Sequence, residues 1–308
     1  MIVEAVKEAD TTVDSPSDWV LEVAQLEEKF CKEIRKVDAS EAIQNLTRSY
    51  PAAYYAIKPY LEQYLNPKVL EVGTGYGFGL CYLHKLGIDA TGIEPGAGIN
   101  GFEGRYSQAI RLLEANGLKN PSEFLYPAVG ESLPFPDNTF DIVYSLDVLE
   151  HVKDVEGCLA EAYRVVKPGG IIKMAVPNYN GLREQHYNVF WLPHLLKSKA
   201  VAKWYVKTFF GRKDWFIDEL NFVTANYFKK LLGRMPQMKD MKIHFYVDQS
   251  VPRLSPIASR IADTYYGAQT RTFRGKVKKF GYGVLLDIVQ NLGLVAILSL
   301  EMHPVKKP

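Results

Sequence analysis

Two kinds of periodicity alternate between residues 61 and 178. Short apolar runs bounded by glycine, proline or polar residues predict five strands, at 68–72, 90–93, 123–128, 140–145 and 170–176. Apolar positions three or four apart predict helices between them, at 79–86, 102–116 and 155–166. This alternation predicts an α/β fold, a doubly wound, Rossmann-like and mostly parallel sheet with helices on both faces. Ligands of such sheets bind at the carboxyl ends of the strands, where the strand order reverses.

The same patterns divide the rest of the chain into three parts. The pattern predicts a helical segment over residues 1–60. Apolar positions recur there at helical spacing, in 17–36, 39–48 and 51–64. Residues 179–235 are rich in aromatic residues and lysine, and they predict a helical insertion after the fifth strand. Residues 236–308 complete a seven-stranded sheet with strands at 241–247 and 295–303, around a helix at 283–293. We expect the N-terminal segment and the insertion to close over the ligand.

Composition favours a globular protein in a reducing compartment. The 308 residues are 47% hydrophobic, enough to bury a full core. The three cysteines are widely spaced, no pair has metal-ligand spacing, and no metal site is predicted. The first 14 residues are too polar for a signal peptide, and polar residues interrupt the longest apolar stretch, 283–300. We therefore expect a cytoplasmic protein with no membrane span.

The net charge of +2 hides an asymmetry. Residues 1–177 hold 16 Lys/Arg against 26 Asp/Glu, a net of −10, and residues 178–308 hold 21 against 9, a net of +12. The second part therefore either faces an anionic substrate or presents an ordinary solvated surface.

The most informative segment follows the first predicted strand. Residues 69–79 read Val-Leu-Glu-Val-Gly-Thr-Gly-Tyr-Gly-Phe-Gly. A strand, a glycine turn and a helix start let a nucleoside-bearing ligand lie against bare backbone. The spacing Glu-x-Gly-x-Gly-x-Gly differs from that of dinucleotide binders, which argues against NAD. Glu94 ends the second strand, 21 residues after Gly73, where a carboxylate either accepts bonds from both ribose hydroxyls or lies in solvent.

Three later segments are short motifs that follow the glycine turn in a characteristic order. Residues 133–135 read Leu-Pro-Phe, 149–152 read Leu-Glu-His-Val, and 164–170 read Arg-Val-Val-Lys-Pro-Gly-Gly. Over about 60–178 the chain resembles the class I S-adenosylmethionine-dependent methyltransferases, in the branch that acts on small molecules. The resemblance implies S-adenosylmethionine as cofactor.

The resemblance also implies roles for individual residues. The turn glycines Gly73, Gly75 and Gly77 would pass the methionine and ribose portions, with Glu71 supporting the turn. Glu94 would hold the ribose hydroxyls. The residues flanking the adenine and lining the methyl-donor site would be Gly130, Glu131, Ser145 and Leu146. Many relatives carry aspartate two residues before the Glu131 position, where this chain has Val129, so the adenine contact falls to Glu131 or to backbone groups.

The candidates for catalysis are Asp147 and His186. Asp147 lies just beyond the fourth strand, on the substrate side. His186 lies in a loop after the fifth strand, and a neutral histidine suits deprotonation of a hydroxyl near pH 7. The alternative is a histidine packed among Tyr187, Phe190 and Trp191. Glu150 and His151 usually begin a helix in this family, which favours a structural role for both.

Residues 197–216 combine basic and aromatic side chains. They form either a lid, with aromatics toward the core and lysines toward water, or a peripheral contact with an anionic membrane surface. A second basic run at 271–279 has the same two interpretations. Neither run matches a nucleic-acid motif, so no nucleic-acid partner is expected, and nothing in the sequence indicates the oligomeric state.

These observations favour a methyltransferase that O-methylates a sugar or a lipid-linked glycan intermediate. The sugar assignment comes from the 177–193 loop, which resembles a subset of such enzymes, and from the charge asymmetry. Two alternatives stay open: a quinone-like or natural-product phenol as acceptor, and a catalytically silent scaffold that retains the fold.

Overall fold

A computed structural model describes residues 12–47, 51–97, 102–192, 196–246 and 297–302. The predicted helix at 283–293 and the basic run at 271–279 lie outside these residues. The described part contains no helix that is both long enough and apolar enough to cross a membrane.

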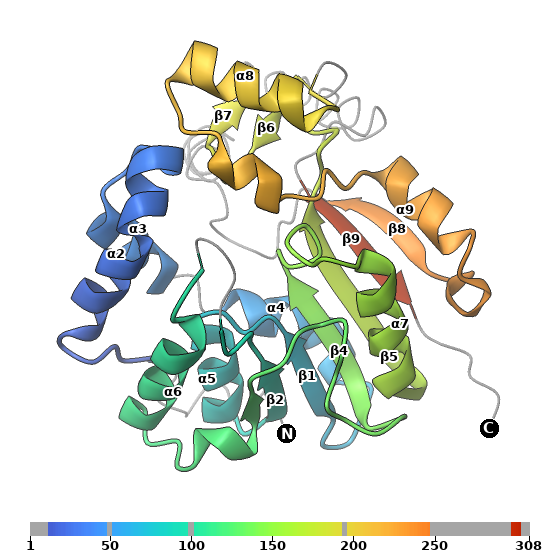
Figure 1. Cartoon of the computed structure of the whole chain (residues 1–308). Helices are drawn as coiled ribbons and strands as arrows, with labels where there is room; N and C mark the ends of the chain where they lie inside the picture. The colour runs from blue at the N-terminus through green and yellow to red at the C-terminus, as the bar shows by residue number, and fades with distance from the viewer. Residues whose placement is uncertain (1–11, 48–50, 98–101, 193–195, 247–296, 303–308) are drawn as a thin grey trace, which may run out of the picture.

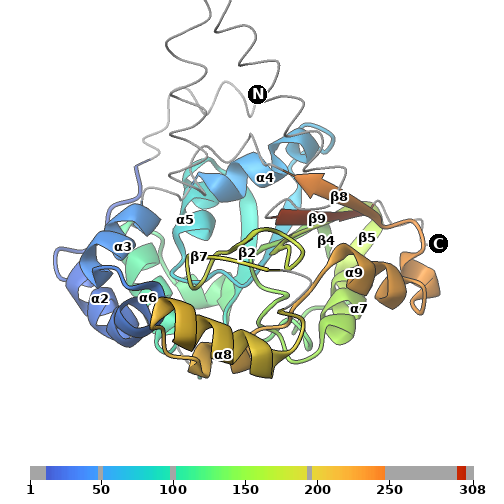
Figure 2. The same ribbon diagram turned by 90° about the horizontal axis from the view of Figure 1, so that it is seen from above.

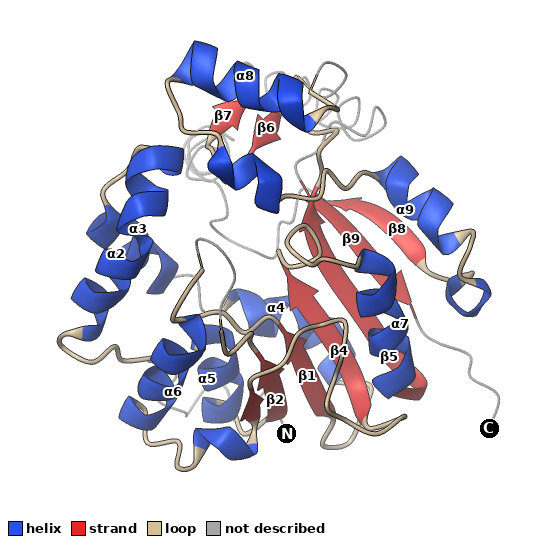
Figure 3. Cartoon of the chain, viewed as in Figure 1, coloured by secondary structure: helices blue, strands red, loops and turns tan. Residues whose placement is uncertain are grey.

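A seven-stranded sheet forms the centre of the molecule, as the sequence predicted (Figures 1 and 3). Its order is β3-β2-β1-β4-β5-β9-β8. The strands are β1 (Lys68–Val72), β2 (Asp89–Ile93), β3 (Leu125–Tyr126), β4 (Phe140–Leu146), β5 (Val166–Pro177), β8 (Lys242–Tyr246) and β9 (Ile297–Met302). The first five are parallel, and β9 is antiparallel to both β5 and β8. The strand order reverses between β1 and β4, so the loops that follow these two strands flank the expected ligand site.

Helices cover both faces of the sheet, which explains why its central strands are mostly apolar on both sides. Alternate residues of β1 enter different cores, Leu70 one and Val69 the other. One face packs against α7 (Val155–Val165) and α9 (Ala225–Leu232). The opposite face packs against α4 (Ala52–Leu61), α5 (Phe78–Lys85) and α6 (Arg105–Ala115), as Figure 2 shows from above.

The N-terminal helical segment packs against α6 and forms a hydrogen bond and ion pairs with it. It consists of α2 (Trp19–Phe30), which continues as a π-helical turn at Cys31–Arg35, and α3 (Ala39–Thr47). Trp19 is fully buried and its Nε1 donates to the carbonyl of Gln108 at 3.1 Å. Arg111 on α6 pairs with Asp18 at 3.2 Å and with Glu22. These contacts place α2 beside the core, next to the carboxyl end of the sheet (Figure 1).

The insertion after β5 lies above the carboxyl ends of the central strands (Figure 1). It begins with a two-stranded hairpin, β6 (Arg183–Glu184) and β7 (Val189–Phe190), where the sequence predicted helix. Asn188 adopts a φ of 53°, a left-handed turn conformation that asparagine tolerates and that a helix excludes. The predicted helices follow as α8 (Lys199–Phe210), a short 3₁₀ segment at Trp215–Glu219, and α9.

Candidate functional site

The glycine turn after β1 is tied to the end of β2 by its backbone. The amides of Gly73 and Thr74 both donate to the carbonyl of Ile93, at 3.0 and 2.9 Å. Gly73 and Gly75 have φ values of 80° and 59°, which L-residues with a side chain rarely adopt. A Cβ on Gly73 would lie 2.4 Å from Val148, whereas a Cβ on Gly75 would have no atom of the described residues within 4 Å other than those of its chain neighbours. Gly75 therefore borders open space.

Glu71 lies inside the protein, next to the helix that follows the glycine turn. Its carboxyl is buried, and its Oε1 would lie 2.7 Å from a Cβ built on Gly79 in the first turn of α5. Burial raises the pKa of Glu71 to about 8, and the nearby Tyr144 hydroxyl offsets this rise only in part. The carboxyl thus packs beneath the start of the helix that follows the glycines, away from solvent.

Glu94 meets the glycine turn directly. Its Oε2 accepts a 2.7 Å hydrogen bond from the amide of Gly75, although the two residues are 19 positions apart. Burial raises the pKa of Glu94, and the Arg105 guanidinium and the Gly75 amide lower it. The fold therefore brings together the carboxylate and the glycines that the sequence selected, with Gly77 next along the turn as the N-cap of α5.

Gly130 and Glu131 lie in the loop after β3 and pack against the N-terminal part of α7. A Cβ on Gly130 would lie 2.7 Å from the Cys158 sulfur, so only glycine fits there. Glu131 Oε1 accepts from the amides of Lys153 and Asp154, at 2.7 and 3.2 Å. The Glu131 carboxylate is therefore already bonded to the backbone at the N-terminus of α7. For this reason, backbone groups are the better candidates for an adenine contact.

The last residues of β4 and the residue after it face different surroundings. Ser145 is fully buried and its hydroxyl donates to the Met174 sulfur at 2.9 Å, so it faces β5. Leu146 is half-buried and packs against the α4–α5–α6 core. Asp147 follows with a φ of 55°, and its amide donates to Ala175 at 2.9 Å. The chain thus turns sharply at Asp147, directly after the strand.

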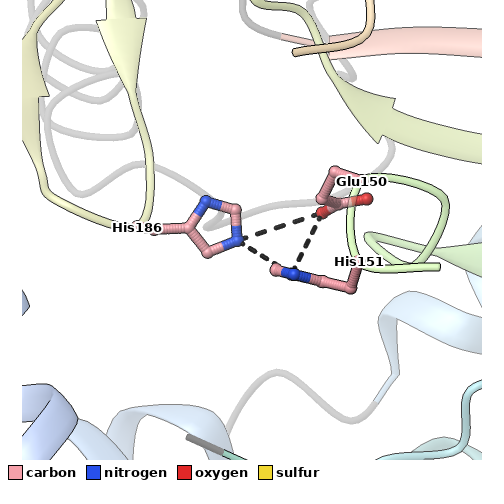
Figure 4. A group of neighbouring side chains, drawn as sticks. All are labelled: Glu150, His151 and His186. Carbon is pink, nitrogen blue, oxygen red and sulfur yellow. Dashed lines mark hydrogen bonds and ion pairs between the residues drawn. The ribbon is translucent and has the colours of Figure 1, made fainter. Parts of the chain in front are cut away.

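Beyond this turn the structure assembles a cluster that the sequence did not predict. Glu150, His151 and His186 meet, the first two from the loop after β4 and the third from the hairpin of the insertion (Figure 4). The Nε2 atoms of the two histidines are 3.1 Å apart, and Glu150 Oε1 lies 3.7 Å from His151 Nε2 and 4.0 Å from His186 Nε2. His186 therefore lies in a polar cluster, in contrast to the purely aromatic environment weighed for it above.

Glu184 orients His186. The His186 Nδ1 donates to Glu184 Oε1 at 2.7 Å, and the amide of Tyr187 donates to the other carboxylate oxygen. Glu184 is itself buried. This bond leaves His186 Nε2 directed at His151 and Glu150. The Glu-x-His spacing of the hairpin and the adjacent Glu-His pair of the β4 loop are the sequence signals for the cluster, but neither shows that the two segments meet.

Neighbouring groups make the cluster rigid. The carbonyl of Glu150 accepts from the amide of Asn221 at 2.6 Å, and the Asn221 side chain donates to Leu149 and Val152. Phe216 packs against both histidines, with ring centroids 5.8 and 5.4 Å away. The insertion thereby holds the β4 loop in place.

Burial disfavours charge on the β4-loop members of the cluster. It lowers the pKa of His151 well below its usual range, and the neighbouring His186 and Arg105 act in the same direction. It raises the pKa of Glu150 well above its usual range, with Asp147 and Glu184 adding to the effect. Burial also raises the pKa of Asp147 to about 6, while His186 lowers it. A neutral imidazole beside buried carboxyls can accept a proton or bind a cation.

Comparison with known proteins agrees with this geometry. Residues 70–174 match the family described as "Methyltransferase domain". A sterol 24-C-methyltransferase of Aspergillus fumigatus is 36% identical over 104 residues, 34% of this chain and 26% of the relative. A demethylmenaquinone methyltransferase of Tropheryma whipplei is 28% identical over 166 residues, 51% of this chain and 63% of the relative. The matched region thus spans less than two thirds of either relative.

Among solved structures, phosphoethanolamine N-methyltransferase 2 of Haemonchus contortus, in complex with S-adenosylmethionine, aligns with 83% of this chain and 53% of its own length. Its sequence identity is 15% and the TM-score is 0.49. The glycine turn, the acidic end of β2, the strand order and the family match lead to one assignment. Residues 70–174 are a methyltransferase domain of the class I S-adenosylmethionine-dependent family, whose cofactor is S-adenosylmethionine.

Proposed function

We propose that this protein transfers the methyl group of S-adenosylmethionine to a hydroxyl oxygen of a sugar or a lipid-linked glycan intermediate. One observation carries the proposal: His186 and its partner Glu184 reach from the insertion to the end of β4, beside the loop that covers the glycine turn. A cofactor lying on the turn would present its methyl group toward this cluster.

Cofactor binding is assigned to the two strand ends. The backbone at Gly73, Gly75 and Gly77 would accept the methionine and ribose portions, because Gly75 borders open space. The Glu94 carboxylate would exchange its bond with the Gly75 amide for bonds with the ribose hydroxyls. The half-exposed Val129 side chain lies next to Gly130, where an adenine ring would need an apolar surface.

Methyl transfer itself asks little of the protein beyond alignment. The acceptor oxygen forms a bond to the methyl carbon as the carbon–sulfur bond breaks, its electron pair returns to sulfur, and the hydroxyl proton leaves. The products are S-adenosylhomocysteine, a methyl ether and a proton. Alignment and exclusion of water supply most of the acceleration, and the Asp147–His186 region is where the proton would be withdrawn.

The outer face of α8 supports a lipid-linked acceptor. Trp204 and Phe209 are 57% and 62% exposed and pack edge to face, with centroids 5.4 Å apart. These two rings do not face the core as the lid interpretation requires, whereas Tyr205 and Phe216 are buried and Phe210 and Trp215 pack against the core. Lys203 and Lys207 form ion pairs with Asp218 and Asp214. Exposed aromatic rings beside lysines suit the surface of an anionic membrane.

A phenolic acceptor remains the second candidate. Phe102 and Phe216 flank His151, with centroids 4.9 and 5.8 Å away, and could stack on an aromatic substrate. A demethylmenaquinone methyltransferase is among the relatives. A silent scaffold would keep cofactor binding and label no acceptor.

The test is incubation of the protein with methyl-labelled S-adenosylmethionine and a cell extract divided into soluble metabolites, lipid-linked material, protein and nucleic acid. We expect label in the lipid-linked or sugar fraction, in a product that resists mild base as an ether does. Label found only in a quinone-like product would contradict the sugar acceptor and identify a phenol as the acceptor instead. Cofactor binding with no label in any fraction would contradict the proposed transfer. His186→Ala should lower turnover at least tenfold while leaving cofactor affinity within about twofold.

A further inference from the structure

We propose that Glu150, His151 and His186 form a binding site for a divalent transition-metal ion, at the carboxyl end of β4. Two imidazole nitrogens and one carboxylate oxygen supply three ligands, and the remaining coordination positions would be open to water or to an oxygen of the acceptor.

The three donor atoms have the right separation for such an ion. The distances of 3.1, 3.7 and 4.0 Å define a triangle whose centre lies about 2.1 Å from each donor. Bonds from zinc to histidine nitrogen and carboxylate oxygen are about 2.0–2.2 Å long. The three side chains are directed at one another (Figure 4), so an ion at this centre would require little movement of the chain.

Glu150 supplies the second, independent observation. Its side chain is fully buried, and neither carboxylate oxygen has a hydrogen-bond partner in the described part of the chain. An unpaired buried carboxyl costs folding free energy, and native proteins rarely keep one without a ligand, water or ion. Its Oε1 lies 3.7 and 4.0 Å from the two Nε2 atoms, so a cation between them would bind all three donor atoms at once.

The hydrogen bonding of His186 is typical of a histidine that binds a metal ion. A histidine ligand usually donates its other ring nitrogen to a carboxylate, which fixes the tautomer and the ring direction. His186 does this through Nδ1 to the buried Glu184, which leaves Nε2, 3.1 Å from His151 Nε2, as the nitrogen that would bind the ion. Two histidines with one carboxylate suit Zn²⁺, Fe²⁺ or Mn²⁺, whereas Mg²⁺ and Ca²⁺ prefer oxygen ligands.

The position of the site suggests its use, and this step rests on the proposed methyl transfer. Val148, two residues before Glu150, covers Gly73 of the cofactor turn. An ion at the cluster would therefore lie close to the expected methyl donor. Binding of the acceptor hydroxyl to the ion would orient its oxygen and lower the pKa of the hydroxyl. His186 would then act as a ligand, and its loss would abolish metal binding as well as turnover.

The decisive experiment measures metal binding by the full-length protein without any substrate. Protein treated with a chelator and then freed of it is titrated with Zn²⁺, and separately with Mn²⁺, by calorimetry. We expect one ion per chain for at least one of the two metals. Glu150→Gln keeps the shape of the side chain but removes its charge, and it should weaken binding at least about 100-fold.

Two further variants separate a metal site from a merely structural cluster. Glu184→Gln should weaken binding about 10- to 100-fold, because it acts only through the orientation of His186. The control is His84→Gln, since His84 is another largely buried histidine, bonded to the Ala90 carbonyl and far from the cluster on α5. His84→Gln should bind metal like the wild type. Circular dichroism establishes that each variant is folded, and His186→Asn replaces Glu150→Gln if the latter unfolds.

Equal affinity in wild type, Glu150→Gln and His186→Asn would overturn the proposal, as would no binding of either metal at millimolar concentration. In that case the cluster is a hydrogen-bonded histidine pair. Failure of the metal site is distinguishable from failure of the proposed function, because S-adenosylmethionine binding and label transfer are measured separately. Metal binding with no label in any fraction would sustain the site and reject the transfer.

Discussion

Substitution of Gly75 by valine tests the cofactor site most directly. Gly75 has a φ of 59°, and a Cβ built on it would meet no other part of the described structure within 4 Å. A valine there would project three carbon atoms into the volume assigned to the cofactor. The backbone cost of a left-handed L-residue is about 1–2 kcal/mol, whatever the side chain touches.

The loss of affinity can be worked out separately from the loss of stability. Excess atoms in a packed space cost about 1–3 kcal/mol, which corresponds to cofactor binding roughly fivefold to 150-fold weaker. The same residue also donates its amide to Glu94, so any backbone adjustment moves the proposed ribose ligand too. We therefore expect the upper end of this range.

Gly117→Val is the matched control. Gly117 has a φ of 78°, and among the described residues its Cβ would also meet nothing within 4 Å, but it lies after the C-terminal end of α6. Both variants should lose similar stability in urea unfolding. Only Gly75→Val should lose affinity for S-adenosylmethionine by calorimetry. Wild-type affinity in folded Gly75→Val, or an equal loss in Gly117→Val, would refute the assignment of the turn.

Three other predictions concern stability and ribose recognition. The pKa of Glu71 is about 8 in the folded protein against 4.5 ordinarily, so between these pH values the folded state binds one proton more than the unfolded state. The stabilising effect of this proton is therefore complete below about pH 4.5. The free energy of unfolding falls by about 1.4 kcal/mol per pH unit as the pH rises from there toward 8. Glu71→Gln should remove this slope from urea unfolding measured at pH 5 and pH 8; an unchanged slope would place the titration elsewhere. Trp19→Ala should cost about 3–5 kcal/mol in the same assay, because the indole is fully buried and bonded to Gln108; a loss below about 1 kcal/mol would mean that α2 contributes little to the core. Glu94→Gln should weaken S-adenosylmethionine binding about tenfold, since charge-assisted bonds to the ribose become neutral ones, while adenine alone should bind with unchanged affinity.

Local sequence determined the strands and the cofactor turn. The register of β1, the sharp turn at Gly73 and Gly75, and the position of Glu94 all follow from short-range requirements: side-chain alternation, a positive φ and a fixed strand–helix–strand spacing. These constraints act over about 25 residues, so a single strand–turn–helix–strand unit contains them completely.

The histidine cluster was decided by tertiary structure. His151 and His186 are 35 positions apart, and their meeting depends on how the insertion packs over β4, through Asn221 and Phe216. The β6–β7 hairpin was likewise hidden, because four short strand residues carry too little periodicity to distinguish them from helix. Neighbours from other elements likewise decided the directions of the Ser145 and Glu131 side chains, which bond to Met174 and to the amide of Lys153. Contacts between distant segments depend on packing complementarity, which local propensity does not encode.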